Sequence, residues 1–303
     1  MRTVNLIPWC TATLSLTLLS LAPAWADSSC TAADYAQADR QAQQAEALER
    51  GGKAAEALEA MQAVRQHECL QTAAMQRVKA AWARATRTLG EQAEKAGRFD
   101  QANAFYVRGE HMADADRAMR KFAQANKSKA SPLGKALLYF EQRQDTAAQA
   151  EVRALALASA EQLLQAEEKT FAAGRASSVP ELQQAREFLR LTGAAGEKRA
   201  NDRALQRGDA LAKGNTPRLL EWAIDHYGFA DARDKSESIK PIARRHGDAA
   251  AARGEHRIAE QFYALSGDDA KIEAMEKSRE KAEGMRQKDF KKGADDLEKE
   301  LKM

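Results

Sequence analysis

The stretch from Leu89 to Tyr106 constrains the fold of this 303-residue chain more than any other part of its sequence. It reads LGEQAEKAGRFDQANAFY, and its small, apolar and aromatic positions are Leu89, Gly90, Ala93, Gly97, Phe99, Ala102 and Tyr106. Gly97 favours a helix end, because glycine adopts a left-handed backbone at little cost, and Gly90 lets a second helix approach closely. Phe99 is expected to pack over the turn, and the last two positions, four residues apart, share one helix face. The stretch therefore predicts two helices that meet at a tight turn.

The same spacing occurs at two other places in the chain. One copy starts 157 residues later, with a histidine in place of the turn aromatic, and consists of Gly247, Ala250, Gly254, His256, Ala259 and Tyr263. A weaker copy precedes both and consists of Ala45, Leu48, Gly52, Ala54, Ala57 and Met61. Gly174 and Gly214 continue a spacing of 40 residues that ends at Gly254. Three aligned matches predict a repeated helical hairpin.

These motifs resemble the tetratricopeptide repeat, a helix-turn-helix unit that stacks into solenoids. The tetratricopeptide unit has 34 residues, whereas the spacings in this chain indicate a longer period of about 40 residues. The resemblance implies an α-solenoid whose concave face binds a peptide or a partner helix. It also implies that Arg87 and Arg244, each three residues before a repeat glycine, hold a carboxylate of an acidic or C-terminal ligand. The alternative is that both are ordinary surface arginines.

Composition and proline placement also predict an all-α fold. Alanine, the strongest helix former, supplies 65 of the 303 residues, and no alternating β-branched run follows residue 27. Pro132, Pro180 and Pro217 lie close to Ser or Thr, as at helix starts, and Pro241 is expected to begin or kink its helix. The aromatic content of 6% suits a thin solenoid better than a compact globule. The predicted helices span 33–50, 53–65, 69–96, 99–108, 113–125, 132–142, 146–173, 180–191, 195–213, 217–227, 236–253 and 255–265.

Residues 1–26 have the features of a secretory signal peptide. Arg2 supplies the positive start, Leu6 to Leu21 is an apolar run, and Ala24-Trp25-Ala26 matches the cleavage pattern. The run is short for a membrane anchor, so we expect cleavage after Ala26 and a mature chain without a membrane span. The mature protein is thus expected to be periplasmic or secreted, with the repeat domain over 27–267 and a separate segment over 268–303.

Two cysteines remain in the mature chain, Cys30 and Cys69. An even count in an oxidising compartment predicts one disulfide, which would tie the N-terminal tail to the helix after Gly52. Two free buried thiols are the alternative. A metal site is not expected, because the two cysteines and His67 lack the spacing of a ligand pair.

The last segment, residues 268–303, carries interleaved charges. Ten Lys and Arg residues and nine Asp and Glu residues lie between Lys271 and Lys302. A sparse apolar stripe accompanies them and consists of Ile272, Met275, Ala282, Met285, Leu297 and Leu301. One interpretation is a charged helix that caps the last hairpin. The other is a free helix that docks a partner as a coiled coil. The heptad pattern is not sustained past Gly293, which argues against this second interpretation.

The sequence contains no catalytic, metal-binding or cofactor-binding motif that we recognise, so we expect a non-enzymatic protein with no cofactor. Its five histidines, which lack metal-ligand pairing, are His67, His111, His226, His246 and His256. An active site assembled from scattered residues is the alternative. The net charge of +3 is spread over interspersed basic and acidic residues, so nucleic acid is not an expected partner.

Two functions from different classes fit these expectations. The first is an exported scaffold or adaptor that binds another protein or a peptide on its concave surface. The second is an envelope module for peptidoglycan or sugar metabolism, similar to the superhelical part of soluble lytic transglycosylases but without their catalytic domain.

Overall fold

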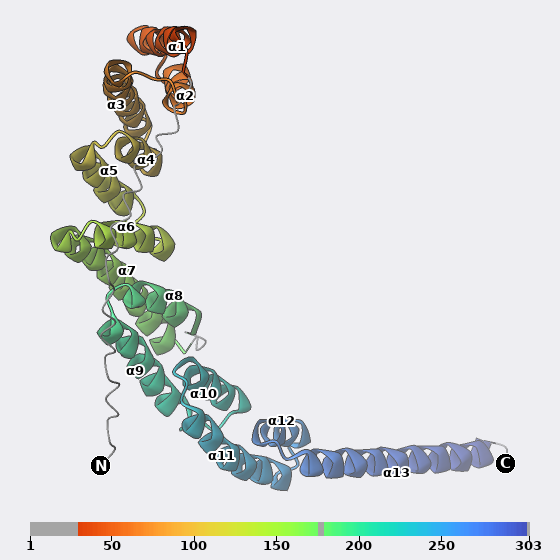
Figure 1. The fold of residues 1–303 in the computed structure, drawn as a ribbon. Helices are drawn as coiled ribbons and strands as arrows, with labels where there is room; N and C mark the ends of the chain where they lie inside the picture. The colour runs from red at the N-terminus through yellow and green to blue at the C-terminus, as the bar shows by residue number, and fades with distance from the viewer. Residues whose placement is uncertain (1–29, 175–178, 302–303) are drawn as a thin grey trace, which may run out of the picture. The chain divides into compact units, whose positions relative to one another are not determined.

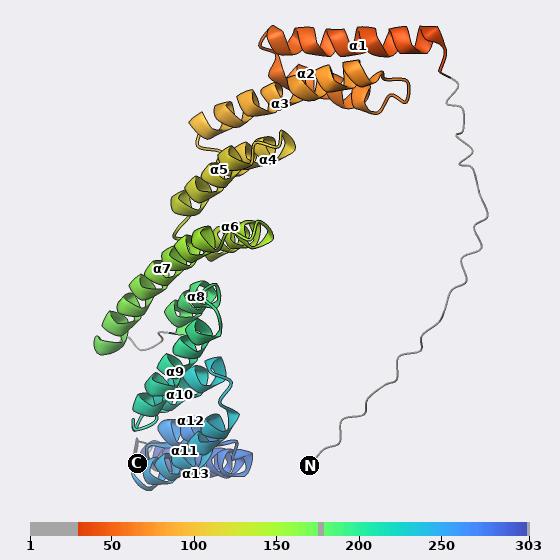
Figure 2. The same ribbon diagram turned by 60° about the vertical axis from the view of Figure 1, so that its left-hand side comes forward.

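The computed structural model describes residues 30–174 and 179–301, with side chains described as far as residue 294. Within these ranges the chain forms thirteen helices and no β-strand, so the predicted all-α fold is confirmed. Consecutive helices pack as hairpins (Figures 1 and 2), which is the arrangement of an α-solenoid helical repeat. The predicted signal peptide lies outside the described residues, and its cleavage stays a prediction.

The helix bounds follow the sequence signals closely. The helices are α1 (Ala32–Arg50), α2 (Ala54–Arg65), α3 (Thr72–Lys95), α4 (Phe99–Arg108), α5 (Met112–Ala125), α6 (Ala130–Gln142), α7 (Thr146–Ala172), α8 (Val179–Arg190), α9 (Ala194–Leu211), α10 (Pro217–Phe229), α11 (Arg233–Ala252), α12 (His256–Ser266) and α13 (Asp269–Leu301). Pro217 begins α10, where Thr216 caps the first turn by accepting a hydrogen bond from the Leu219 N–H. Pro241 does not begin a helix, because it lies inside α11 and removes one backbone donor there.

The chain divides into two compact units. Unit 1 comprises residues 30–92 and 105–111, and unit 2 comprises residues 93–104 and 112–301. In unit 1, buried alanines of α1 and α2 lie with Met61, Val64 and Val78 in one apolar cluster. The sulfur atoms of Cys30 and Cys69 are at disulfide distance, and their Cα atoms are 5.7 Å apart. This contact ties the start of α1 to the loop before α3.

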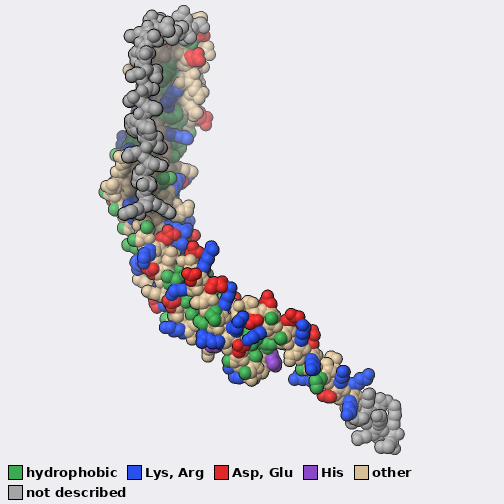
Figure 3. Space-filling view, turned by 60° about the horizontal axis from the view of Figure 1, so that its bottom comes forward, with side chains coloured by type: hydrophobic (Ala, Val, Ile, Leu, Met, Phe, Trp, Pro, Cys, Tyr) green, Lys and Arg blue, Asp and Glu red, His purple; other side chains and the backbone are tan. Residues whose placement is uncertain are grey.

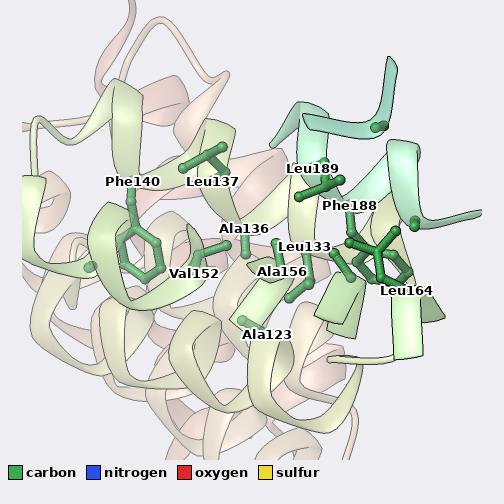
Figure 4. Packing of buried hydrophobic residues seen from close by; sticks show 14 of the residues in the cluster. Ala123, Leu133, Ala136, Leu137, Phe140, Val152, Ala156, Leu164, Phe188 and Leu189 are labelled. Atoms are coloured by element: carbon green, nitrogen blue, oxygen red, sulfur yellow. The ribbon is translucent and has the colours of Figure 1, made fainter. Parts of the chain in front are cut away.

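Unit 2 contains two larger apolar clusters. The first joins α5 to α9 and includes Phe140, Val152 and Leu189 among closely packed alanines (Figure 4). The second joins α9 to α13 and includes Leu220, Ile239 and Phe262. Alanines supply many of the fully buried positions, so neighbouring helices approach closely without many large side chains.

The turns repeat as regularly as the helices. Within four hairpins the turn contains a glycine at positive φ, and these are Gly52, Gly97, Gly174 and Gly254. Gly214 lies in the turn between α9 and α10, as the 40-residue spacing indicated, but it lacks positive φ. The turn there closes through the Thr216 cap, and Gly214 itself packs on Leu219 without positive φ.

The turns that join one hairpin to the next close in the same way as the turns at Gly52, Gly97 and Gly254. The carbonyl groups of Tyr106, Phe140, Tyr227 and Tyr263 each accept a hydrogen bond from the N–H five residues later. The residue before each of those donors has positive φ, and these are Glu110, Gln144, Asp231 and Gly267. This is the Schellman arrangement of a helix end. An aromatic ring therefore occupies an equivalent position in these four hairpins.

The charged C-terminal segment forms one long helix, α13. Ile272 and Met275 near its start are partly buried against the cluster of α9 to α12. Beyond them, Met285 and Phe290 are exposed, with 59% and 81% of their surface accessible. The start of α13 therefore covers the last hairpin, whereas its described continuation lies open to solvent.

Candidate functional site

Three helix pairs are held by a glycine that faces a tyrosine ring. A Cβ atom added to Gly90, Gly208 or Gly247 would lie 2.5–2.7 Å from the nearest ring atom of Tyr106, Tyr227 or Tyr263, respectively. Real Cβ atoms do not approach that closely, so each glycine is required for the ring to pack flat on the helix. The pairs at Gly90 and Gly247 follow the predicted 16-residue spacing. The pair at Gly208 is separated by 19 residues and was missed by the sequence pattern.

Two of these tyrosines also belong to a charged triad. Tyr227 Oη donates to Asp209 Oδ1 at 2.8 Å, and Lys235 Nζ donates to the same carboxylate at 2.6 Å. Tyr263 Oη donates to Asp248 Oδ1 at 2.9 Å, and Lys271 pairs with that carboxylate. The lysine bonds, followed by the tyrosine bonds, lower the pKa of both aspartates. Burial, helped by the hydrogen bond to Asp248, raises the pKa of Tyr263 to about 12. Both phenols therefore stay protonated at neutral pH and act as structural donors.

Ion pairs bridge the odd-numbered helices along the chain. The bridges are Arg77 to Asp39 and Glu46, Arg84 to Glu49, Arg117 and Lys121 to Glu94, Arg120 to Asp145 and Glu151, Arg199 to Glu161, Arg203 and Arg207 to Glu167, Lys235 to Asp209, and Lys271 to Asp248. Most of these groups are partly exposed, so each pair contributes little to stability. On the face shown in Figure 3, blue and red side chains intermingle over the C-terminal half of the chain. That face therefore presents no one-signed patch for a polyanion.

Glu167 of α7 differs from the other acids because its side chain is fully buried. Its carboxylate accepts hydrogen bonds from Arg203 Nε at 3.0 Å and from Arg207 Nε at 2.8 Å. The Arg207 guanidinium also lies 4.0 Å from the centre of the Phe171 ring. His226 is buried in the same part of unit 2, and burial lowers its pKa to about 4. Glu167 and the two arginines form a charge-compensated network, and Arg203 also lines an open pocket on the surface of unit 2.

Unit 2 has an open pocket of about 520 Å³ between α6, α7 and α8, here named the α6 pocket. Its floor is apolar and consists of Pro132, Leu163 and Phe188. Its rim is mainly neutral and consists of Ser128, Ser131, Ser159, Gln162 and Gln184, with Lys129 and Glu187 at the edges. The first turn of α6 contributes to this lining and has no side-chain cap. An apolar floor ringed by neutral hydrogen-bonding groups suits an extended peptide segment.

The predicted repeat positions lie in the helix contacts. Ala57, Ala102 and Ala259 are fully buried, and Leu89 is partly buried against Ala54 and Leu58. Phe99 is the first residue of α4 and is partly exposed. These positions pack within the fold, and none of them lines the α6 pocket.

The two predicted ligand-binding arginines lie in different units. Arg87 is 56% exposed, and its Nε lies 3.5 Å from Glu91 one turn later. Arg244 Nε lies 3.0 Å from Asp268 Oδ2, whose side chain is only 13% exposed. A ligand carboxylate at Arg244 would therefore compete with an internal one. The role of Arg87 and Arg244 as partner contacts stays a prediction.

Among the described residues, no group of three or more His, Cys, Asp or Glu side chains is arranged to hold a metal ion. None of the described helices is both long and apolar enough to cross a bilayer. In the comparisons with known proteins, no family model, curated protein or solved structure matches the chain.

Proposed function

We propose that this protein is an exported, non-enzymatic scaffold that binds a segment of another protein. The α6 pocket is the observation that carries this proposal. Three consecutive helices form it, and its 520 Å³ can take one large apolar side chain with the adjoining backbone. Its neutral serines and glutamines contrast with a chain in which 30% of residues are charged. Such groups hydrogen-bond a peptide backbone without requiring a charge on the partner.

The proposed location outside the cytoplasm is supported by the cysteine pair. Cys30 and Cys69 lie at disulfide distance, and disulfides persist in oxidising compartments. The predicted signal peptide supplies the export route. A periplasmic or secreted protein that binds peptides through helical hairpins accounts for both features.

In vivo photocrosslinking tests the proposal directly. A photoreactive amino acid at Ser131, on the exposed rim of the α6 pocket, should crosslink to a discrete protein partner. The matched control is Ser238, an exposed serine of α11 that does not line this pocket. Gln162→Trp should fill the pocket with an indole ring and abolish the Ser131 crosslink while leaving the melting temperature unchanged. Equal crosslinking from both serines, or a crosslink that survives Gln162→Trp, would contradict the proposal.

The same preparation distinguishes the envelope-module alternative. Protein mixed with purified sacculi and sedimented should remain in the supernatant if the partner is a protein. Sedimentation with sacculi that depends on an open α6 pocket would favour the peptidoglycan function instead. The Arg87→Ala variant gives a further test. A partner that contacts the predicted concave face should bind this variant more weakly.

A further inference from the structure

Unit 1 contains a small pocket around the indole of Trp82. Its volume is about 220 Å³, and α2, α3 and the end of α4 contribute its walls. Arg65, Met75, Lys79 and Arg108 surround Trp82, and Glu110 supplies the single acid. We name this cavity the Trp82 pocket. It is separate from the α6 pocket, which lies wholly in unit 2.

The arginines of the Trp82 pocket differ from two other arginines of unit 1, Arg77 and Arg84. Arg77 and Arg84 are both held by carboxylates of α1, at 2.6 Å and 2.8 Å. In contrast, neither Arg65 nor Arg108 forms an ion pair with any residue of the described ranges. Lys79 approaches Glu110 only at 3.6 Å, with both side chains more than 70% exposed. The pocket thus holds three cations against one acid, and two guanidinium groups have no internal anion.

The backbone around these cations is fixed by several contacts. Trp82 Nε1 donates to the Arg108 carbonyl at 2.9 Å, and a ring nitrogen of His111 lies 2.6 Å from the Ala83 carbonyl. Gly109 packs so tightly on Thr86 that an added Cβ would meet its hydroxyl at 2.1 Å. Arg65 lies over the indole, with its Cζ 4.9 Å from the ring centre. The chain therefore places Arg65 and Arg108 around Trp82 before any ligand arrives, which lowers the entropic cost of binding.

We propose that the Trp82 pocket binds a carboxylate carried by a short apolar segment of a polypeptide. The guanidinium fork matches a carboxylate in two parallel hydrogen bonds, and the indole edge with Met75 gives an apolar wall for the carrier. The volume suits one chain end or one acidic side chain. This inference rests on the proposed function in taking the ligand to be a peptide, and it names a second contact with different chemistry. Cell-wall peptides share the carboxylate, so sacculi form a separate arm of the test.

Trp82 itself reports on the pocket. Trp82 and Trp222 are the tryptophans that follow the predicted signal peptide, so Trp222→Phe leaves Trp82 as the single indole of the mature protein. Titration with acetyl-Ala-Ala-Leu bearing a free carboxylate should change the Trp82 emission saturably. The same peptide as a carboxamide should bind at least about tenfold more weakly, because it loses the charge-assisted bonds.

Paired substitutions locate the effect. Arg65→Gln with Arg108→Gln should weaken binding of the free-acid peptide at least about tenfold. The melting temperature should change little, because neither arginine has an internal ion-pair partner and the contact of Arg65 with the indole is exposed. Arg40→Gln, an exposed arginine of α1 outside the pocket, is the matched control and should bind like the parent. Equal affinity for acid and amide, or an unaltered affinity in the double variant, would overturn the inference. Sedimentation with sacculi that requires the two arginines would also overturn it, by reassigning the carboxylate to the cell wall. Because Ser131 crosslinking probes unit 2, it reports on the proposed function independently of this result.

Discussion

The ring of Tyr263 lies flat against Gly247, with its Cε1 atom 2.7 Å from the place where a Cβ would stand. The hydroxyl group of the same tyrosine donates to Asp248, the residue that follows the glycine. Gly208 and Tyr227 repeat this arrangement with Asp209. One glycine therefore fixes both the distance between two helices and the position of a buried phenol.

Gly247→Ala should destabilise the protein, although alanine is normally the better helix former. The new methyl group would force the Tyr263 ring away, and overpacking of this kind costs about 1–3 kcal/mol. Gly228→Ala is the matched control, since Gly228 lies in α10 with no atom within 4 Å of its added Cβ. That variant should gain about 0.5–1 kcal/mol from helix propensity. Urea unfolding of the two variants should move the midpoint in opposite directions, and equal shifts would contradict the contact.

Ala102→Trp and Ala259→Trp should each destabilise strongly. Both alanines are fully buried, so an indole requires neighbouring helices to separate at a cost of about 1–3 kcal/mol or more. Lys281→Ala on the exposed part of α13 should leave the thermal melt unchanged. Tolerance of tryptophan at either alanine would show that the helices there do not pack as described.

His226 should make stability depend on pH in a defined window. Burial lowers its pKa from about 6.5 in the unfolded chain to about 4 in the fold, so the unfolded chain binds the proton more readily between those values. The stabilisation is complete above about pH 6.5 and is lost as the pH falls towards 4, by roughly 2–3 kcal/mol. His226→Gln should flatten this part of the profile. His256→Gln, at an exposed histidine, should leave the slope as it was.

The mature protein should begin at Asp27 and carry a Cys30–Cys69 disulfide. The closed loop spans 39 residues, and its loss should destabilise the first hairpin by about 4 kcal/mol in the chain-entropy model. Intact mass before and after alkylation without reductant measures both claims. Uptake of two alkyl groups would show that the two cysteines are free thiols. A mass above that of a chain starting at Asp27 would show that cleavage occurs before Asp27.

The sequence predicted the helices better than the contacts between them. Periodic alanines, the turn glycines and the prolines at helix starts are local signals, and the observed helix bounds lie within three residues of those predicted. The pair of Gly208 and Tyr227 was missed because the longer α9–α10 connection shifts their spacing from 16 to 19 residues. Gly214 lies in that connection, as its spacing indicated, but without positive φ.

The candidate pockets could not be predicted, since their residues are distant in sequence. Arg65 and Arg108 are 43 residues apart, and nothing local distinguishes them from the many surface arginines. What distinguishes them is their place beside Trp82, which depends on how α2, α3 and the end of α4 pack. Trp82 offered the one available signal, as one of four tryptophans in the chain.

The ion pairs between odd-numbered helices also favour one order of the hairpins over others. Helix α5 presents Arg117 and Lys121 to the acid before it and Arg120 to the acids after it, whereas α7 presents acids on both sides. A tandem duplication of α5 and α6 would place arginines of one copy against those of the next, and like charges in contact oppose that order. A simple copy of this hairpin would therefore lose its ion pairs on one side, and an inserted hairpin would keep them only if its charges were opposite in sign to those of both neighbours.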